Sequence, residues 1–169
     1  MKKITKLFWL GMVLISSISY AQNARLQVIH NSPDLAAATV DVYVNNIILL
    51  NDFTFRTATP FIDVPAGVSL SIDVAPSTSS SSAEGIFNLT ATLAAGETYI
   101  IVANGIVSAT GYSVAPNFNL NVYALGREAA TSPTNTDVLE NHGSPDAPTV
   151  DVVETSIPAG TIVDDISFP

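Results

Sequence analysis

From Arg25 onward, apolar and polar residues alternate in short runs, and no segment has the spacing of an amphipathic helix. Within residues 39–44, 69–74 and 118–123 every second side chain is apolar, and Pro, Gly, Asn, Asp and Ser separate one run from the next. Period-two alternation bounded by turn residues predicts β-strands with one buried face. The predicted strands lie within Leu26–His30, Val40–Val44, Ile47–Leu50, Phe53–Arg56, Phe61–Val64, Leu70–Val74, Ile86–Leu93, Thr98–Ala103 and Phe118–Val122.

These strands fall within about 100 residues, and each apolar face has to be buried against a second sheet. We therefore predict an all-β fold, an immunoglobulin-like antiparallel β-sandwich, over residues 22–127. A small closed barrel is the alternative that the same pattern allows. The sequence contains no cysteine, so the hydrophobic core has to hold this domain together without disulfides. A domain of about 100 residues buries enough surface to do so.

Three blocks of residues occur twice in the same order. They are His30-Asn31-Ser32-Pro33-Asp34, Thr39-Val40-Asp41-Val42 and Asp52-Phe53-Thr54-Phe55, followed later by His142-Gly143-Ser144-Pro145-Asp146, Thr149-Val150-Asp151-Val152 and Asp165-Ile166-Ser167-Phe168. This recurrence predicts a tandem repeat, with a linker at residues 128–137 and a second repeat over residues 138–169. The second repeat is incomplete, because nothing in it corresponds to residues 56–126.

An incomplete repeat of this length cannot close a sandwich on its own. We expect the chain to be a fragment of a longer protein whose second repeat continues beyond Pro169. The alternative is that the tail pairs elsewhere, for example by donating its strands to another molecule, because free strand edges favour a partner.

Residues 1–21 have the layout of a secretory signal peptide. A lysine-rich start precedes an apolar stretch at residues 7–18, and Ser19 and Ala21 supply small side chains before a predicted cleavage at Gln22. The rival interpretation is a transmembrane anchor, but about 12 apolar residues are too few where roughly 20 are needed. We predict a protein that is secreted or held on the outer surface of a Gram-negative type of bacterium.

Removal of this segment makes the chain strongly acidic. All three lysines lie in it, which leaves three arginines against fifteen acidic residues, a net charge of −12. Affinity for nucleic acid comes largely from cationic side chains that neutralise phosphates, so nucleic acid is excluded as a partner. No transmembrane segment is predicted after signal removal, and the expected partner is a protein or a glycan at the cell surface.

The residue types of a catalytic triad occur at His30, Ser32 and Asp34, but their spacing argues against one. Alternate residues of a strand lie about 6.6 Å apart, whereas a nucleophile and its base need roughly 2.6–3.2 Å. We interpret Ser32-Pro33-Asp34 as a turn, with Pro33 presetting φ and Ser32 or Asp34 bonding nearby amides. His30 is expected to bond a backbone carbonyl. The residues assigned this structural role in the two repeats are His30, Ser32, Pro33, Asp34, Asp41, His142, Ser144, Pro145, Asp146 and Asp151.

Two further residue sets suggest binding rather than catalysis. Aspartates recur near strand ends or on polar faces, and Ca²⁺ needs six to eight oxygen ligands from several segments. These aspartates are Asp34, Asp41, Asp52, Asp63 and Asp73. The simpler interpretation is solvation and turn capping, so no metal or cofactor site is predicted and Ca²⁺ remains an alternative. The tyrosines Tyr43, Tyr99, Tyr112 and Tyr123 could form a carbohydrate- or protein-binding face, although strand tyrosines more often keep a hydrated hydroxyl.

The motifs resemble a known bacterial family. They are His-x-Ser-Pro-Asp followed by Thr-Val-Asp-Val-Tyr, then Val64-Pro65-Ala66-Gly67, and Val122-Tyr123-Ala124-Leu125-Gly126. Over residues 25–127, and again from Val138, the chain resembles the domain-of-unknown-function family 4397. The resemblance implies tandem, secreted or surface-attached immunoglobulin-like modules. Similar proteins often end in a C-terminal sorting domain, which is not visible here and fits truncation. The family implies no activity.

We therefore expect a non-enzymatic extracellular or cell-surface interaction or structural module, adhesin-like or a spacer. The sequence contains no Gly-x-Ser-x-Gly elbow, no phosphate-binding loop and no cysteine nucleophile. The alternative is a carbohydrate-binding accessory domain, assisted by Ca²⁺ if the aspartates converge.

Overall fold

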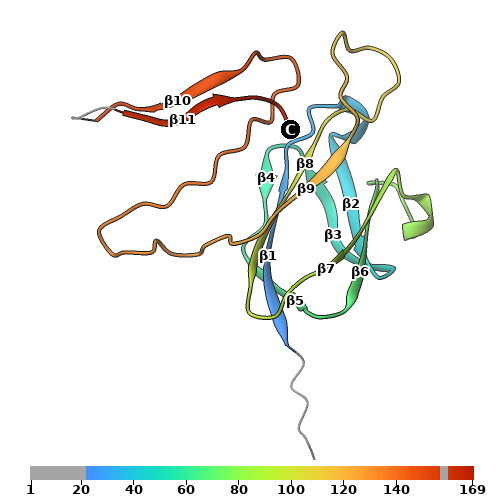
Figure 1. Cartoon of the computed structure of the whole chain (residues 1–169). Helices are drawn as coiled ribbons and strands as arrows, with labels where there is room; N and C mark the ends of the chain where they lie inside the picture. The colour runs from blue at the N-terminus through green and yellow to red at the C-terminus, as the bar shows by residue number, and fades with distance from the viewer. Residues whose placement is uncertain (1–21, 157–159) are drawn as a thin grey trace, which may run out of the picture.

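The computed structural model describes residues 22–156 and 160–169, and the predicted signal peptide at residues 1–21 lies outside the described residues. The described chain is all-β apart from two short 3-10 helices, η1 (Leu35–Ala37) and η2 (Ser82–Glu84) (Figure 1). One sheet has the order β4 (Thr57–Ala58), β1 (Asn23–His30), β8 (Thr98–Asn104) and β9 (Asn119–Tyr123), and β5 (Ile62–Pro65) also pairs with β1. The other has the order β3 (Ile47–Thr54), β2 (Thr39–Val44), β6 (Ser69–Pro76) and β7 (Phe87–Thr92). A hairpin of β10 (Val150–Glu154) and β11 (Gly160–Ile166) follows.

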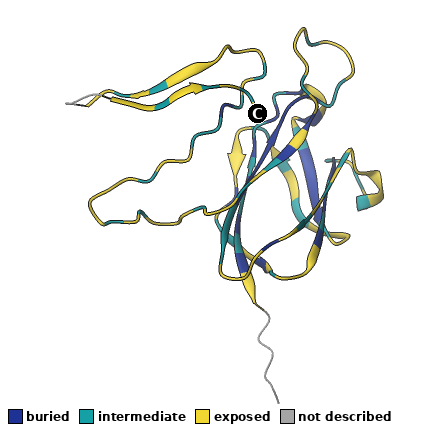
Figure 2. Cartoon of the chain, viewed as in Figure 1, coloured by how far each residue is buried: buried dark blue, intermediate teal, exposed yellow. Residues whose placement is uncertain are grey.

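We call residues 22–127 the two-sheet body and residues 138–169 the hairpin segment. In the two-sheet body, the apolar faces of the two sheets enclose one hydrophobic core (Figure 2). Leu26 and Ile101 from one sheet and Leu70 and Val74 from the other are each no more than 2% exposed. Burying one such side chain stabilises the fold by about 1.5–3 kcal/mol. In the described ranges no strand joins the two sheets and neither sheet closes on itself, so the closed-barrel alternative is wrong.

The predicted antiparallel pairing is wrong for one pair of strands. β1 and β8 run parallel, from the pair Arg25 and Thr98 to the pair His30 and Ala103, whereas the other strand pairs of the two-sheet body are antiparallel. Parallel neighbours require a long crossover, and the second sheet supplies it between β1 and β8. A hydrophobic pattern shows which face of a strand is buried but does not identify its neighbour.

The two strands predicted at residues 47–50 and 53–56 correspond mainly to one continuous strand, β3. Its register against β2 shifts twice, between Val40 and Val42 and between Val42 and Tyr43, so that β3 carries two extra residues relative to β2, which is a β-bulge. Within the bulge, Asp52 has a φ of 53°, a left-handed conformation that aspartate adopts more readily than most residues. The bulge interrupts the period-two alternation, which is why the sequence pattern divides the strand.

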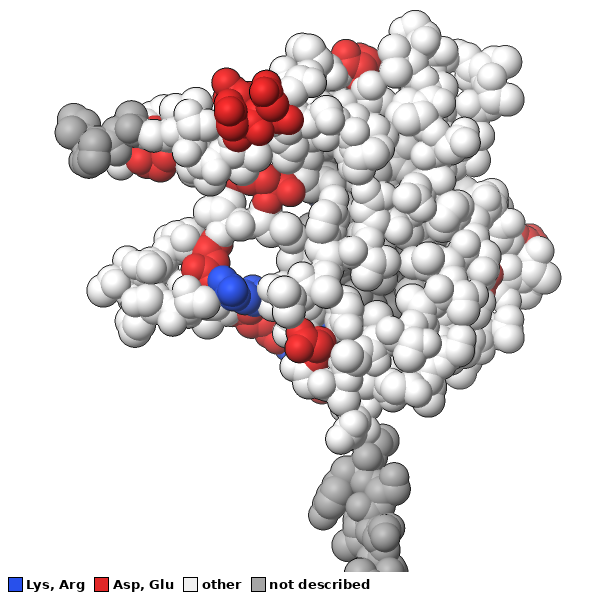
Figure 3. Space-filling view, viewed as in Figure 1, with Lys and Arg blue, Asp and Glu red and all other residues white. Residues whose placement is uncertain are grey.

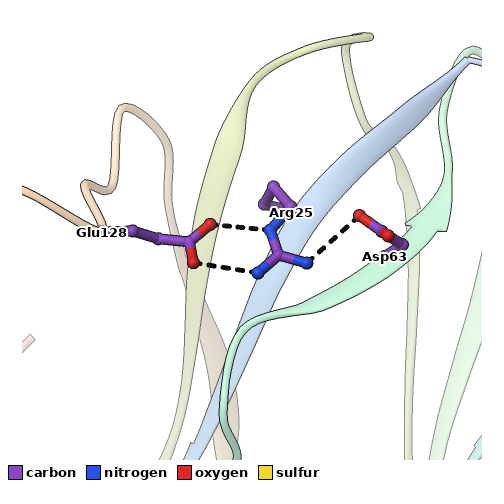
Figure 4. Close-up of polar contacts among 3 residues, drawn as sticks. All are labelled: Arg25, Asp63 and Glu128. Atoms are coloured by element: carbon purple, nitrogen blue, oxygen red, sulfur yellow. Dashed lines mark hydrogen bonds and ion pairs between the residues drawn. The ribbon is translucent and has the colours of Figure 1, made fainter.

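The predicted linker forms an irregular loop that is tied to the two-sheet body by charge pairs. Arg127 and Asp137 form an ion pair of 2.6 Å across the loop. Arg25 on β1 donates to both carboxylate oxygens of Glu128 at 2.7 and 2.9 Å and to Asp63 at 3.2 Å (Figure 4). The Arg25 hydrogen bonds lower the pKa of the Glu128 carboxyl. The start of the linker is therefore attached to the sheet that contains β1.

Candidate functional site

Asp34 lies at the end of the two-sheet body where the β1–β2 and β8–β9 loops meet, which we call the loop end. Its carboxylate is only 1% exposed. It accepts hydrogen bonds from the amides of Ala36 (2.9 Å), Val107 (2.7 Å) and Ser108 (2.5 Å), and from the hydroxyls of Ser108 (2.8 Å) and Tyr112 (3.1 Å). Burial alone would raise the pKa of Asp34, but the hydrogen bonds outweigh it and lower this pKa to about 2. One buried carboxylate therefore joins two loops.

The other polar residues of the first motif also bond the protein backbone. His30 is 1% exposed, and its Nε2 donates to the carbonyl of Ala37 at 2.7 Å. Burial lowers the pKa of His30, and the bond to Ala37 opposes this only in part. The fully buried hydroxyl of Ser32 donates to the carbonyl of Gly105 at 2.7 Å. Among the described residues, no hydrogen bond joins His30, Ser32 and Asp34 to one another, so they do not form a triad.

The second motif repeats only part of this arrangement. Nε2 of His142 lies 3.1 Å from the carbonyl of Pro148, which matches the contact of His30. Ser144 donates to Asp146 at 3.1 Å, and Asp146 is exposed. The hairpin segment has no counterpart of the β8–β9 loop whose amides enclose the aspartate of the first motif.

Asp41 and Asp151 lie away from the loop end, in the equivalent strands β2 and β10. Asp41 is 1% exposed and accepts from the amide of Asp52 at 2.9 Å. Asp151 is exposed and accepts from the amide of Asp165 at 3.0 Å. Asp52 and Asp165 have φ values of 53° and 55°, and the register shifts at matching positions in both hairpins. Each aspartate therefore satisfies an amide that its bulge removes from the ladder.

The two copies of the motif are in contact with each other. Asn31 donates to the carbonyl of Gly143 at 3.1 Å and to the side chain of Asn104 at 2.9 Å. The side-chain oxygen of Asn141 accepts from Asn104 at 3.3 Å and from the hydroxyl of Tyr123 at 2.8 Å. A Cβ on residue 143 would lie 1.8 Å from Nδ2 of Asn31. A side chain at residue 143 would therefore displace the Asn31 amide group that bonds the second motif.

A pocket of about 450 Å³ lies between the loop end and the hairpin segment; we call it the junction pocket. Three parts of the two-sheet body line it, represented by Asn31, by Phe55 with Arg56, and by Tyr112. The hairpin segment contributes residues 141 and 143–146 to the wall. The guanidinium carbon of Arg56 lies 5.1 Å from the centre of the Phe55 ring, within the range of a cation–π contact. The pocket therefore offers cationic, anionic, amide and apolar groups.

The five aspartates considered for Ca²⁺ do not converge. Asp63 pairs with Arg25, and Asp73 accepts from Ser71 and Asn88. Within the part of the chain that the structure describes, the one group of three carboxylates with oxygens within 4.8 Å of one another is Asp151, Asp164 and Asp165. These three are exposed on the hairpin, where Figure 3 shows acidic atoms gathered.

The four tyrosines are distributed over both sheets and a loop, and each hydroxyl has a partner within the chain. The partners of Tyr43, Tyr99, Tyr112 and Tyr123 are respectively Ser79, the amide of Ala94, Asp34 with the amide of Leu35, and Asn141. Of the four, Tyr112 lines the junction pocket.

Sequence reasoning missed Arg56, Asn104 and Asn141. Arg56 could have been singled out as one of only three arginines in the sequence. The exchange of Asn31 for Gly143 within an otherwise repeated pentapeptide was a second signal, because glycine permits close backbone approach. No sequence pattern marks Asn104 or Asn141, whose contacts depend on the folded chain.

Among the described residues, no helix has the length and apolar character needed to cross a bilayer. No curated protein matches the chain. The sequence model of the family described as "Domain of unknown function (DUF4397)" matches residues 24–153. This match includes the two-sheet body, the predicted linker and the first strand of the hairpin, and it covers most of the chain. The chain therefore belongs to the DUF4397 family.

Proposed function

We propose that the protein is a non-catalytic extracellular or cell-surface interaction and structural module, adhesin-like or a spacer. The observation that carries the proposal is the use of the motif's polar groups. His30, Ser32 and Asp34 are buried, and their hydrogen bonds go to Ala37, to Gly105 and to the β8–β9 loop. A nucleophile or general base has to present a free group to a substrate. These side chains instead stabilise a rigid loop end.

The finer architecture we propose is a tandem of immunoglobulin-like sandwiches, of which the hairpin segment is the beginning of a second copy. The matched bulges of the β2–β3 and β10–β11 hairpins support this, as do the equivalent bonds of Asp41 and Asp151. The parallel pairing of β1 with β8 suits a sandwich in which the first and last parts of the domain are neighbours. Contact between the motifs suits a spacer whose copies keep a defined orientation.

Export to the outer surface of a Gram-negative type of cell is part of the same proposal and rests on the signal-peptide pattern of residues 1–21. N-terminal sequencing of the secreted protein is expected to begin at Gln22. Recovery of secreted protein that still starts at Met1 would contradict this part.

A carbohydrate-binding accessory role is the second candidate, and the junction pocket favours it. Its volume of about 450 Å³ is within the usual range for small-molecule sites, about 300–1,000 Å³. Unlike those of Ser32 and Asp34, the polar side chains that line this pocket are only partly used in hydrogen bonds within the described protein.

The test is an activity screen on the purified full chain, run beside the variants His30→Ala and Ser32→Ala. We expect no hydrolysis of ester, glycoside or peptide substrates above buffer. Ser32→Ala is included because it removes a potential nucleophile if His30→Ala fails to fold. Turnover that either variant abolishes, while circular dichroism shows a folded chain, would overturn the proposal. Self-association in analytical ultracentrifugation would favour an adhesin, and a monomer with a docked hairpin segment would favour a spacer.

A further inference from the structure

The junction pocket is formed by two parts of the chain that are distant in sequence. The loop end supplies Asn31 and Arg56, and the hairpin segment supplies Asn141 and Asp146. The second motif is held against the first by the bonds of Asn31 and Asn104 to residues 141 and 143. A ligand in this pocket would therefore contact both copies of the motif simultaneously.

Arg56, the arginine that lines this pocket, has no anionic partner among the described residues. The other two arginines of the described chain, Arg25 and Arg127, both form salt bridges. Within the described residues no hydrogen-bond acceptor meets the Arg56 guanidinium, which stacks on Phe55 instead. An arginine held in this way keeps its five donors available for a ligand.

The other polar side chains that line the pocket include hydrogen-bond donors and hydrogen-bond acceptors that have no partner within the described protein. Among the described residues, Asn141 uses its oxygen in two bonds but its amide nitrogen in none, and Asn31 uses its nitrogen but not its oxygen. Asp146 accepts one bond, from Ser144, at Oδ1. Arg56 is the one cationic side chain that lines the pocket and Asp146 is the one carboxylate, so their charges balance. Ile106, Tyr112 and Val114 add apolar surface to the wall.

We infer that the junction pocket binds a sugar ring of an extracellular glycan, and that it does so only while the second motif is docked on the first. Each sugar hydroxyl both donates and accepts, which suits a wall that carries an arginine, two amides and a carboxylate. The C–H face of the ring suits the apolar part of the wall. Balanced charge favours a neutral sugar over an anion, since the surrounding protein is acidic. This inference rests on the proposed function and gives it a ligand class.

Docking can be disturbed by a substitution at residue 143, where the second motif meets Asn31. In Gly143→Ala the new Cβ would overlap Nδ2 of Asn31 and lie 2.9 Å from Nδ2 of Asn141 and 3.0 Å from the Asn104 oxygen, so these side chains have to shift and the bond of Asn31 to residue 143 is disturbed. Gly160→Ala is the matched control, because a Cβ there meets nothing within 4 Å. Arg56→Ala removes the free guanidinium, and Arg127→Ala is its control in charge.

The experiment probes the full chain with an array of neutral glucose-, mannose- and galactose-terminated oligosaccharides, followed by calorimetric titration of any retained glycan. We expect Arg56→Ala and Gly143→Ala each to weaken binding at least about tenfold, the loss of one hydrogen bond to a charged group. Gly160→Ala and Arg127→Ala are expected to leave affinity within about twofold. The NMR signals of the side-chain amides of Asn31 and Asn104 report whether docking is lost.

The outcomes separate this inference from the proposed function. Binding that survives Arg56→Ala and Gly143→Ala, or no retention of any neutral glycan, overturns the inference and leaves a non-catalytic module standing. Hydrolysis of a retained glycan that His30→Ala abolishes would overturn the proposed function instead. If Gly143→Ala fails to fold, Asp146→Asn takes its place, since Asp146 is exposed and its one hydrogen bond within the protein is to Ser144.

Discussion

Replacing Asp34 with asparagine is the most direct test of how the loop end is held together. The carboxylate accepts three amide and two hydroxyl hydrogen bonds from Ala36 and the β8–β9 loop. Asparagine keeps the size of the side chain, but its NH₂ group is a donor and cannot accept a hydrogen bond from the amides and hydroxyls that surround it. The amides of Val107 and Ser108 are then left without an anionic acceptor in a site that is nearly closed to water.

The magnitude follows from the pKa of Asp34. Its fall from 3.8 to about 2, at about 1.4 kcal/mol for each pKa unit, means that the ionised carboxylate stabilises the fold by about 2 kcal/mol. Because the folded pKa lies below the unfolded one, this stabilisation is complete above about pH 5 and is lost as the pH falls from about 4 to 2. For a domain of about 100 residues, a loss of about 2 kcal/mol lowers Tm by roughly 10 °C.

The assay is urea unfolding of the full chain at several pH values between 7 and 2, with the loss of β-structure monitored by far-ultraviolet circular dichroism. Asp34→Asn is expected to lose about 2 kcal/mol or more at pH 7 and to lose less than the unmodified chain between pH 5 and 2. Asp164→Asn is the control with the same charge change, at an exposed residue, and is expected to change stability by less than about 0.5 kcal/mol. Parallel pH profiles for Asp34→Asn and the unmodified chain would refute the reasoning.

Two other predictions concern buried polar residues. Asp41→Ala leaves the amide of Asp52 without its acceptor and removes one of the two partners of the Ser79 hydroxyl, the other being Tyr43. It is expected to cost about 1–3 kcal/mol in urea unfolding, whereas Asp151→Ala, at an exposed position, is expected to cost under about 1 kcal/mol; equal losses would contradict the difference in burial. His30 is expected to remain neutral with its proton on Nε2 at pH 6.5 in nitrogen–proton correlation NMR, because burial lowers its pKa. The associated stability is then lost as the pH falls below 6.5, and a cationic ring at pH 7 would contradict this prediction.

The β-strands could be predicted from sequence because their signal is local. In β1 and β6 every second side chain faces the core, and the apolar residues follow this period through to Val28 and Val74. The parallel neighbour of β1 could not be predicted, because pairing depends on where a chain returns after a long crossover. The bulge in β3 could not be placed either, since two extra residues between Ile48 and Phe53 shift the alternation and resemble a strand boundary.

The candidate site was predictable only in part. The repeated motif drew attention to His30 and Asp34, and the structure places both at the loop end, with Nε2 of His30 and the carboxylate of Asp34 hydrogen-bonded within the protein and Nδ1 of His30 buried without a partner. The junction pocket has no sequence signature, because Arg56 and Asp146 become neighbours of one cavity only through tertiary contact. His30 and Asp34 belong to a motif that occurs twice in the sequence, whereas Arg56 belongs to no repeated block.

The two copies of the pentapeptide illustrate this limit most clearly. Asp34 and Asp146 follow the same Ser-Pro pair, yet one is 1% exposed with five hydrogen bonds and the other is exposed with one. The difference arises from the β8–β9 loop, whose amides surround Asp34 and which the hairpin segment does not contain. The distant β8–β9 loop, and not the repeated Ser-Pro-Asp sequence, therefore determines that the carboxylate of Asp34 becomes a buried acceptor.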